Sequence, residues 1–309
     1  RANLAKTVTV SKAILVASLF KAIGRKVIMY LDYYELTTYP FRTNPDPGFL
    51  WFGEKHKEAL SLLKYGILKR DGFLLLTGDV GTGKTSLIRY LLKLIDSSAL
   101  VATIHDPDMP TIDFFNYLSA EFEMNRVFTN KADFLIHFKK FLLKAHSEHK
   151  STFVIIDEAQ RLNHQRLEEI RLLSNIELDD QKLINIFFIG QSEIEKIFMD
   201  ERNKAISQRI NLSYHIQPLD ELETVHYIAH RLKIAGAKRG IFSVAACREI
   251  FSISGGVPRL INSMCDCALL SGFARGRKVV DVKLINECQI DLRIPIGTIA
   301  KHKRPAQDP

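Results

Sequence analysis

One short segment constrains the fold of this chain more than any other: residues 78–85 read Gly-Asp-Val-Gly-Thr-Gly-Lys-Thr. The apolar run 73–76 precedes this loop, and a helical pattern over residues 86–95 follows it. A strand, a glycine-rich loop and a helix in this order form the phosphate cradle of P-loop nucleotide-binding proteins. The sequence therefore predicts an α/β core that binds a nucleoside triphosphate, which we take to be ATP.

The residue types in this loop each have a physical reason. The glycines let the backbone wrap around phosphate oxygens, so that successive N–H groups and the helix N-terminus face the anion. Lys84 adds a positive charge for the β- and γ-phosphates, and Thr85 offers a hydroxyl to Mg²⁺. The candidate phosphate-binding residues are Gly78, Asp79, Val80, Gly81, Thr82, Gly83, Lys84, Thr85 and Ser86.

A second apolar segment, residues 152–156, ends in the acidic pair Asp157-Glu158. At the tip of a strand, Asp157 would hold Mg²⁺ directly or through water, and Glu158 would polarise an attacking water. An acidic pair after a strand is also typical of a helix N-cap with a solvated neighbour. Together with the P-loop, the pair favours a hydrolase whose Mg²⁺ ligands are Thr85 and Asp157.

Two competing motifs carry less weight. Residues 130–133 read Asn-Lys-Ala-Asp, the guanine-specificity motif of GTPases, but they precede Asp157 instead of following it. We interpret Asn130 as the cap of a helix over 134–143. Residues 157–160 resemble the helicase DEAx box, yet we find no strand-separation motifs with them. Helicase activity is therefore disfavoured.

Composition agrees with a cytoplasmic enzyme. The 309 residues are 46% hydrophobic, enough for one large or two modest domains. A net charge of +8 permits nucleic acid or an anionic membrane surface as partner, although solvated surface is the ordinary explanation. The four cysteines lack metal-ligand spacing and indicate buried or free thiols in a reducing compartment. No apolar stretch approaches the ~18 residues of a membrane span.

The first 28 residues contain lysine and arginine but no acid. Their apolar stretch 13–20 is short for a signal peptide. The first methionine is Met29, and Gly-Arg-Lys at 24–26 is what a purine-rich ribosome-binding sequence would encode. Our hypothesis is that the natural protein begins at Met29. The alternative is a real, flexible basic extension.

Alternating strand and helix patterns predict a parallel sheet covered by helices, followed by a helical lid. We place an N-terminal linker region at 29–70, the P-loop core at 71–218, the lid at 219–292 and a disordered tail at 293–309. Further predicted strands are 99–104, 183–189 and 213–217. The predicted helices are 113–122, 133–145, 166–174, 221–234, 244–253, 258–271 and 281–290.

A set of segments follows in the order typical of one family. These are 39–47 (Tyr-Pro-Phe-Arg-Thr-Asn-Pro-Asp-Pro), 49–51, 56–60, 72–73, 157–160, 171–177, 190–193, 207–210 and 255–262. Through these segments the chain resembles the general secretion pathway protein A (ExeA-type) family of AAA+ ATPases, from about Met29 to Leu292. Relatives of that family include ATPases of exopolysaccharide and protein-sorting clusters and target-selecting ATPases of transposons.

The resemblance implies roles for residues outside the loop. Gln191 occupies the sensor 1 position near the γ-phosphate, although an ordinary loop residue would look the same. Arg209 is similar to the finger arginine that reaches a neighbouring subunit's nucleotide; its alternative is a surface arginine. Arg259, in Gly-Gly-Val-Pro-Arg, resembles sensor 2 in the lid. Residues 39–41 would border the adenine or simply pack.

The expected function is Mg²⁺-dependent ATP hydrolysis in a homo-oligomeric ring or helix serving a secretion or export assembly. Family members commonly continue into a membrane helix and a periplasmic cell-wall-binding region, whereas this chain stops soon after the lid. That favours a stand-alone cytoplasmic ATPase, peripheral to the inner membrane, or a truncated sequence. The alternatives are an ATP-dependent DNA-binding regulator of transposition and a non-hydrolysing scaffold, against which Glu158 argues.

Overall fold

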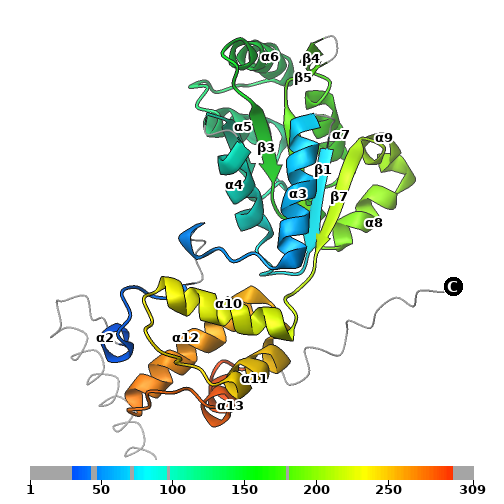
Figure 1. The fold of residues 1–309 in the computed structure, drawn as a ribbon. Coiled ribbons are helices and arrows are strands. Elements are labelled where there is room, and N and C mark those ends of the chain that lie inside the picture. The colour runs from blue at the N-terminus through cyan, green and yellow to red at the C-terminus, as the bar shows by residue number, and fades with distance from the viewer. Residues whose placement is uncertain (1–29, 43–46, 70–72, 96–97, 179–180, 295–309) are drawn as a thin grey trace, which may run out of the picture.

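The structure is a computed structural model that describes residues 30–42, 47–69, 73–95, 98–178 and 181–294. Figure 1 shows a sheet with its covering helices above a separate group of helices. The proposed start at Met29, the segment before it and most of the expected tail lie outside the described residues. Among the helices that the structure describes, none combines the length and apolar character that crossing a membrane requires.

The core is a five-stranded sheet in the order β2-β3-β6-β1-β7, and every pairing in it is parallel. The predicted α/β fold class is therefore confirmed, because parallel neighbours need helical crossovers. The strands are β1 (Phe73–Gly78), β2 (Leu100–Ile104), β3 (Thr152–Ile156), β6 (Asn185–Gly190) and β7 (Ile210–Ile216), and a separate hairpin joins β4 (Glu177–Leu178) to β5 (Gln181–Lys182).

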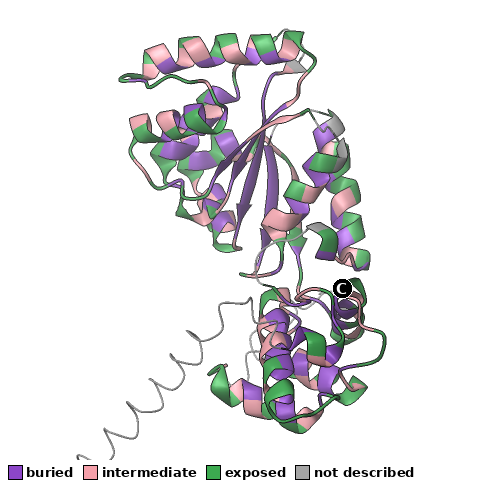
Figure 2. Cartoon of the chain, turned by 90° about the vertical axis from the view of Figure 1, so that its left-hand side faces the viewer, coloured by how far each residue is buried: buried purple, intermediate pink, exposed green. Residues whose placement is uncertain are grey.

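Both faces of the sheet are covered, and side chains alternate between them along each strand. In β1, Leu74 and Leu76 face a cluster on one side, while Phe73 and Leu75 face the cluster on the other. Figure 2 shows the central strands buried throughout. The first face packs against α3 (Glu54–Lys69) and α4 (Lys84–Ile95); the second packs against α5 (Thr111–Glu121), α6 (Lys131–Ser147), α7 (His164–Leu173), α8 (Glu193–Met199) and α9 (Lys204–Ser207).

Most predicted elements are present with shifted ends. The P-loop helix begins at Lys84, two residues before the predicted start, because the loop turns directly into it. Strand β7 is longer than predicted, since it is an edge strand whose alternating exposure hides its apolar pattern. The capping role of Asn130 is confirmed: its side chain accepts a hydrogen bond from the Asp133 N–H at 2.9 Å. Helix α8 and the β4–β5 hairpin were not predicted.

The segment expected to be a linker region divides between the two parts of the molecule. Helix α3 belongs to the sheet, because Ala59, Leu63 and Ile67 recur every four residues and bury against it. Aromatic side chains of residues 30–49 instead join the core of the lid. That stretch holds α2 (Leu31–Tyr34) and the short helix η1 (Pro47–Phe49).

The lid consists of four helices and begins with a capping box in which Asp220 and Glu223 bond each other's backbone N–H. Gly255 ends one helix in the left-handed region, with φ of 60°, where a glycine is favoured. The lid was predicted to begin at residue 219, and its first helix begins at Glu221. The lid helices are α10 (Glu221–Ile234), α11 (Val244–Ser254), α12 (Pro258–Ala274) and α13 (Val282–Asp291).

All four cysteines of the sequence lie in the lid as free thiols, as predicted. Burial raises the pKa of Cys247 to about 11 and that of Cys265 well above its ordinary value. Cys267 is partly exposed and differs, because the Cys288 thiol donates a hydrogen bond to its sulfur and lowers its pKa. The four thiols are therefore chemically unequal.

We predict that iodoacetamide at pH 7.5 modifies Cys267 at least tenfold faster than Cys247 or Cys265, because only the thiolate is nucleophilic. Peptide mass spectrometry after a short reaction measures the modified fraction at each position. Cys288→Ala removes the thiol that donates this hydrogen bond and should slow the modification of Cys267. Equal modification of all four thiols in the folded protein would contradict this assignment.

Candidate functional site

The P-loop connects β1 to α4 and forms the centre of the candidate site. Gly81 and Gly83 have φ of 85° and 90°, a region that residues with a Cβ rarely adopt. The Lys84 ammonium donates to the carbonyl oxygens of Gly78 and Asp79, each at 2.9 Å. Thr82 donates its hydroxyl to the same Asp79 carbonyl at 2.8 Å. These bonds hold the loop curled around the lysine. The Lys84 ammonium could exchange the two carbonyl oxygens for phosphate oxygens when a nucleotide binds.

The charge of Lys84 is balanced by its surroundings. Burial lowers the pKa of the ammonium, while the carboxylates of Asp157, Glu158 and Asp79 act in the opposite direction. A partly buried cation without a bound anion is costly, and a phosphate group would offset that cost. The site is therefore suited to an anionic ligand.

Thr85 and Asp157, 72 positions apart in the sequence, meet at the carboxyl edge of the sheet. The Thr85 hydroxyl donates to Asp157 Oδ2 at 2.9 Å, and His105 Nδ1 lies 4.0 Å from the same oxygen. A hydroxyl and a carboxylate beside a phosphate cradle fit Mg²⁺, which is usually held by one or two such groups plus substrate phosphates. No cluster of three or more His, Cys, Asp and Glu side chains that could hold a metal occurs within the described ranges.

The order of the strands brings the other candidate residues to the same edge. Strand β6 lies between β1 and β3, and its Gly190 pairs with Thr77 of β1, so Gln191 ends beside the P-loop. Glu158 follows Asp157 in a left-handed conformation, with φ of 50° and ψ of 37°, and its side chain is exposed. The structure thus brings Glu158 and Gln191 together with the loop.

The lid contacts the P-loop through the start of α12. The Arg259 N–H donates to the Gly81 carbonyl at 3.3 Å, and a Cβ at Gly81 would lie 2.6 Å from the Arg259 Cβ. The glycine is therefore required for space as well as conformation. The Arg259 side chain is exposed at the rim of the site. Arg259 lines the cavity beside the P-loop, and its contact with the γ-phosphate stays a prediction.

Arg209 is not brought to this site. It precedes β7 at the amino edge of the sheet, where its carbonyl accepts from the Phe73 N–H. The P-loop lies at the opposite edge, and six residues of strand at ~3.3 Å each put it ~20 Å away. The guanidinium instead donates to Ser174 Oγ at 2.9 Å and to Asn175 Oδ1 at 2.6 Å. Arg209 cannot reach the nucleotide site of its own chain.

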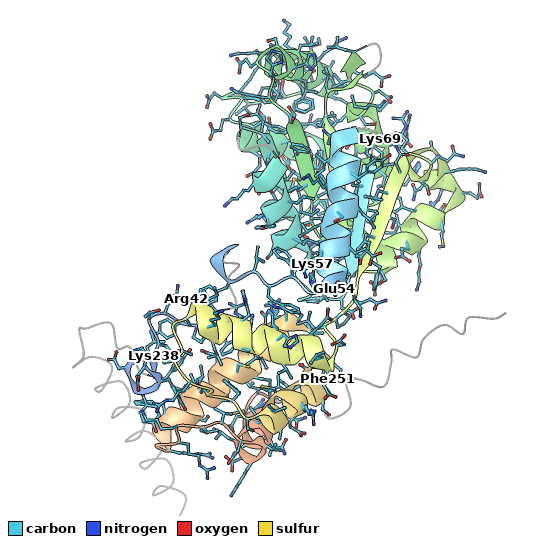
Figure 3. All side chains as sticks on the ribbon, viewed as in Figure 1. Arg42, Glu54, Lys57, Lys69, Lys238 and Phe251 are labelled. Atoms are coloured by element: carbon cyan, nitrogen blue, oxygen red, sulfur yellow. The ribbon has the colours of Figure 1, made fainter. Side chains whose placement is uncertain are left out.

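A cavity of about 340 Å³ opens between the sheet domain and the lid beside the P-loop. Arg42 on the lid side and Glu54 at the end of α3 flank this junction in Figure 3. Aromatic and basic side chains from both domains line it, as suits a flat base joined to an anion. The lining includes Arg42, Phe49, Trp51, Phe52, His56, Tyr227, Arg231 and Asn262.

The base-binding role expected for residues 39–41 is not supported, because none of them lines this cavity. Phe41 is 2% exposed within the lid core, and the Pro40 carbonyl accepts from Arg231. Arg42, immediately after them, does line the cavity. The sequence prediction missed Arg42 by one position. An irregular segment has no periodicity from which the direction of its side chains could be predicted.

The sequence also missed the polar residues of the lid wall. Arg231 donates to the Tyr227 hydroxyl at 2.8 Å, and Tyr227 donates to Asn262 at 2.9 Å, so that α10 and α12 are joined beside the cavity. Burial lowers the pKa of His56, which keeps its imidazole neutral at pH 7. His56 lies within residues 56–60, one of the segments that carry the family resemblance. That membership was the only sequence signal that could have indicated a functional role for His56.

Comparison with known proteins agrees with this geometry. Residues 67–198 match the family described as AAA domain. General secretion pathway protein A of Aeromonas hydrophila is 37% identical over 251 residues, which cover 80% of this chain and 46% of that protein. The chain thus spans about half the length of this curated relative, and the resemblance predicted from the sequence is confirmed.

Two solved structures share the fold. The ORC2 protein of Aeropyrum pernix, determined as ADPNP-ADP complexes, gives a TM-score of 0.65 at 18% identity, covering 81% of this chain and 70% of that one. Cdc6p of Pyrobaculum aerophilum gives 0.61 at 17% identity, with coverages of 80% and 70%. At such identities the likeness concerns the fold. Residues 67–198 of this chain therefore form an AAA domain, and the chain is similar, over 80% of its length, to general secretion pathway protein A.

Proposed function

We propose that this protein hydrolyses ATP with Mg²⁺ and uses the reaction to change the position of its lid. The observation that carries the proposal is the Thr85–Asp157 hydrogen bond of 2.9 Å, because it joins the phosphate loop to the acidic strand end. Bound Mg²⁺ would neutralise charge on the β- and γ-phosphates. Thr85 and Asp157 would hold that ion, and the residues of the P-loop would hold the phosphates.

The remaining residues have separate tasks in this proposal. Glu158 takes a proton from the attacking water, and its exposed carboxylate at the strand end leaves room for that water. Gln191 helps to place the water near the γ-phosphate. The Arg259 side chain binds the γ-phosphate from the lid. The hydrogen bond from its backbone N–H to the Gly81 carbonyl joins the lid directly to the P-loop. Loss of the γ-phosphate would then release the lid from the core.

We further propose that the active form is a homo-oligomer in which Arg209 completes a neighbour's site. Its position at the amino edge of the sheet supports this. An arginine so far from its own P-loop could stabilise charge on a nucleotide only if that nucleotide were bound to another subunit. Such a contribution is made mainly in the transition state. The site of one chain would therefore be incomplete without its neighbour.

Arg209→Ala protein should bind ATP nearly normally and hydrolyse it at least 100-fold more slowly, because arginine fingers contribute about 10³–10⁵ to kcat. Mixing it with inactive Glu158→Gln protein should restore part of the activity, since some interfaces pair an intact Glu158 with an intact Arg209. Asn175→Ala is the matched control: it removes the 2.6 Å intrachain bond and should retain activity. Mixed oligomers, verified by crosslinking, that recover no ATPase activity would refute the trans role.

The secretion role rests on the name of the Aeromonas relative, of which this chain covers 46%. We propose a cytoplasmic ATPase at the inner membrane that serves a secretion or export assembly. Affinity purification of the protein from its source cell, with the Glu158→Gln variant to trap the ATP-bound form, tests the proposal. Recovery of transposition proteins in place of envelope components would contradict it.

The distribution of charge bears on the DNA-binding alternative. Nine of the 43 lysines and arginines lie in residues 1–28 and 295–309, which contain one of the 35 acidic residues, so residues 29–294 carry 34 of each. A central region without net charge does not favour duplex DNA as a partner. We expect duplex DNA to change the ATPase rate less than twofold. Strong stimulation that falls steeply with salt would favour a transposition regulator.

A further inference from the structure

The side chain of Gln160 bridges two residues of the candidate site. Its Nε2 donates to Glu158 Oε2 at 2.6 Å, and its Oε1 accepts from the backbone N–H of Gln191 at 3.0 Å. A carboxylate can only accept and a peptide N–H can only donate, so these two partners fix the orientation of the amide. The acidic pair after β3 and the end of β6 are thereby joined through one side chain.

The end of β6 is shaped to admit this amide. A Cβ at Gly190 would lie 2.7 Å from Gln160 Oε1, closer than the two atoms can approach. Gly190 is not among the glycines with positive φ, so another residue could adopt its conformation. The backbone nitrogens of Gln160 and Ala159 would lie 3.3 and 3.4 Å from the same Cβ, so the Gln160 amide is the tightest of three contacts that favour a glycine at this position.

Glu158 needs such a restraint. Its backbone is left-handed, with φ of 50°, a conformation that is strained for a residue with a Cβ. Its carboxylate is exposed. Within the described part of the chain, Gln160 Nε2 is the donor that forms a hydrogen bond with this carboxylate. A general base must lie within hydrogen-bond reach of the water that it deprotonates. Displacement of a reacting group by about 1 Å can cost 10²-fold in rate.

We propose that Gln160 is a positioning residue that holds the Glu158 carboxylate at a fixed position relative to Gln191. The general base and the end of β6 beside the γ-phosphate site would then keep a constant geometry. This inference rests on the proposed ATP hydrolysis. Gln160 acts through Glu158 and contacts no reacting atom. Its loss therefore affects kcat and leaves the affinity for ATP unchanged.

Steady-state ATPase kinetics and equilibrium binding of ATP test whether Gln160 affects kcat without affecting the affinity for ATP. Gln160→Ala should lower kcat about tenfold, as losses of supporting hydrogen bonds commonly do, with the Kd for ATP within twofold of wild type. Gln160→Glu retains the length and the acceptor for Gln191 but repels Glu158, and it should lower kcat at least as much. Gln165→Ala, an exposed glutamine on α7, is the matched control and should keep the wild-type kcat.

Hydrogen exchange of the nucleotide-free protein gives a readout that does not depend on activity. The Gln191 N–H donates to Gln160 Oε1, so its exchange, followed by NMR, should accelerate at least tenfold in Gln160→Ala. It should stay slow in Gln160→Glu and in Glu158→Gln, in which the acceptor remains. The amides within β6 are held by the sheet and should not change in any of these variants.

Gly190→Ala tests the packing argument. In the wild-type background the added methyl group should displace the amide and lower kcat about as much as Gln160→Ala. In the Gln160→Ala background its further effect should be much smaller, because the 2.7 Å clash has been removed and only the contacts of 3.3 and 3.4 Å with backbone nitrogens remain. Two additive losses would show that the residues act independently.

The results separate this inference from the proposed function. If the wild-type protein does not hydrolyse ATP, or if Glu158→Gln does not affect hydrolysis, the proposed function fails. If hydrolysis depends on Glu158 but Gln160→Ala keeps the wild-type kcat, or leaves exchange of the Gln191 amide unchanged, the positioning role is overturned.

Discussion

Glu158→Gln is expected to lower kcat for ATP hydrolysis about 10²–10⁴-fold while leaving the Kd for ATP within about twofold. Glutamine has nearly the same shape, and its carbonyl can still accept the bond from Gln160 that Glu158 accepts at 2.6 Å. The P-loop and the Thr85–Asp157 pair remain intact, so phosphates and metal are held as before. What is lost is the group that takes the proton from water.

A phosphate-release assay and isothermal titration with ATP measure the two quantities separately. Glu123→Gln, on the exposed end of the α5 region, controls for the loss of one negative charge and should be silent. A Glu158→Gln protein that turns over ATP at the wild-type rate would remove Glu158 from the mechanism. A parallel loss of binding would instead indicate a metal-binding or structural role.

Lys84→Ala should weaken ATP binding about tenfold to a hundredfold. Hydrogen bonds to charged groups contribute about 1.5–3 kcal/mol, and each 1.4 kcal/mol is tenfold in Kd. The ammonium already lies inside the curled loop, bonded to the carbonyls of Gly78 and Asp79 at 2.9 Å. Phosphate oxygens would bind it without moving it far, so little of this interaction energy is spent on rearrangement.

The matched control is Lys93→Ala on the same helix, whose exposed side chain is two turns away from the loop. Equilibrium titration with a fluorescent ATP analogue should give the wild-type Kd for this variant. Circular dichroism should give the same helical content for both variants. Unchanged ATP affinity in Lys84→Ala would refute the assignment of the nucleotide site.

The sequence by itself determined the fold class and the phosphate loop, because both follow from local patterns. Glycine spacing in the loop and the apolar strands around it can be read directly, and so can the acid at the end of residues 152–156. The cap at Asn130 is equally local, since its partner Asp133 is three residues away. Short-range signals of this kind need no knowledge of the rest of the chain.

The segment 29–70 shows where local patterns fail. Its aromatic residues before position 50 bury in the lid and helix α3 buries against the sheet, yet nothing in their spacing tells which domain each will cover. That choice depends on which apolar surfaces the rest of the chain leaves open. The cavity wall was missed for the same reason, because Arg42 and Tyr227 of the lid meet His56 of α3 only when the lid docks.

Tertiary structure decided the geometry of the site. Strand order places β6 between β1 and β3, and only this order sets Gln191 beside both the P-loop and Glu158. It also sends Arg209 to the far edge, which no reading of the residues around it could reveal. Sequence specifies what each residue can do through its chemistry and its near neighbours. The folding of distant strands into one sheet decides which of those groups are close enough to act together.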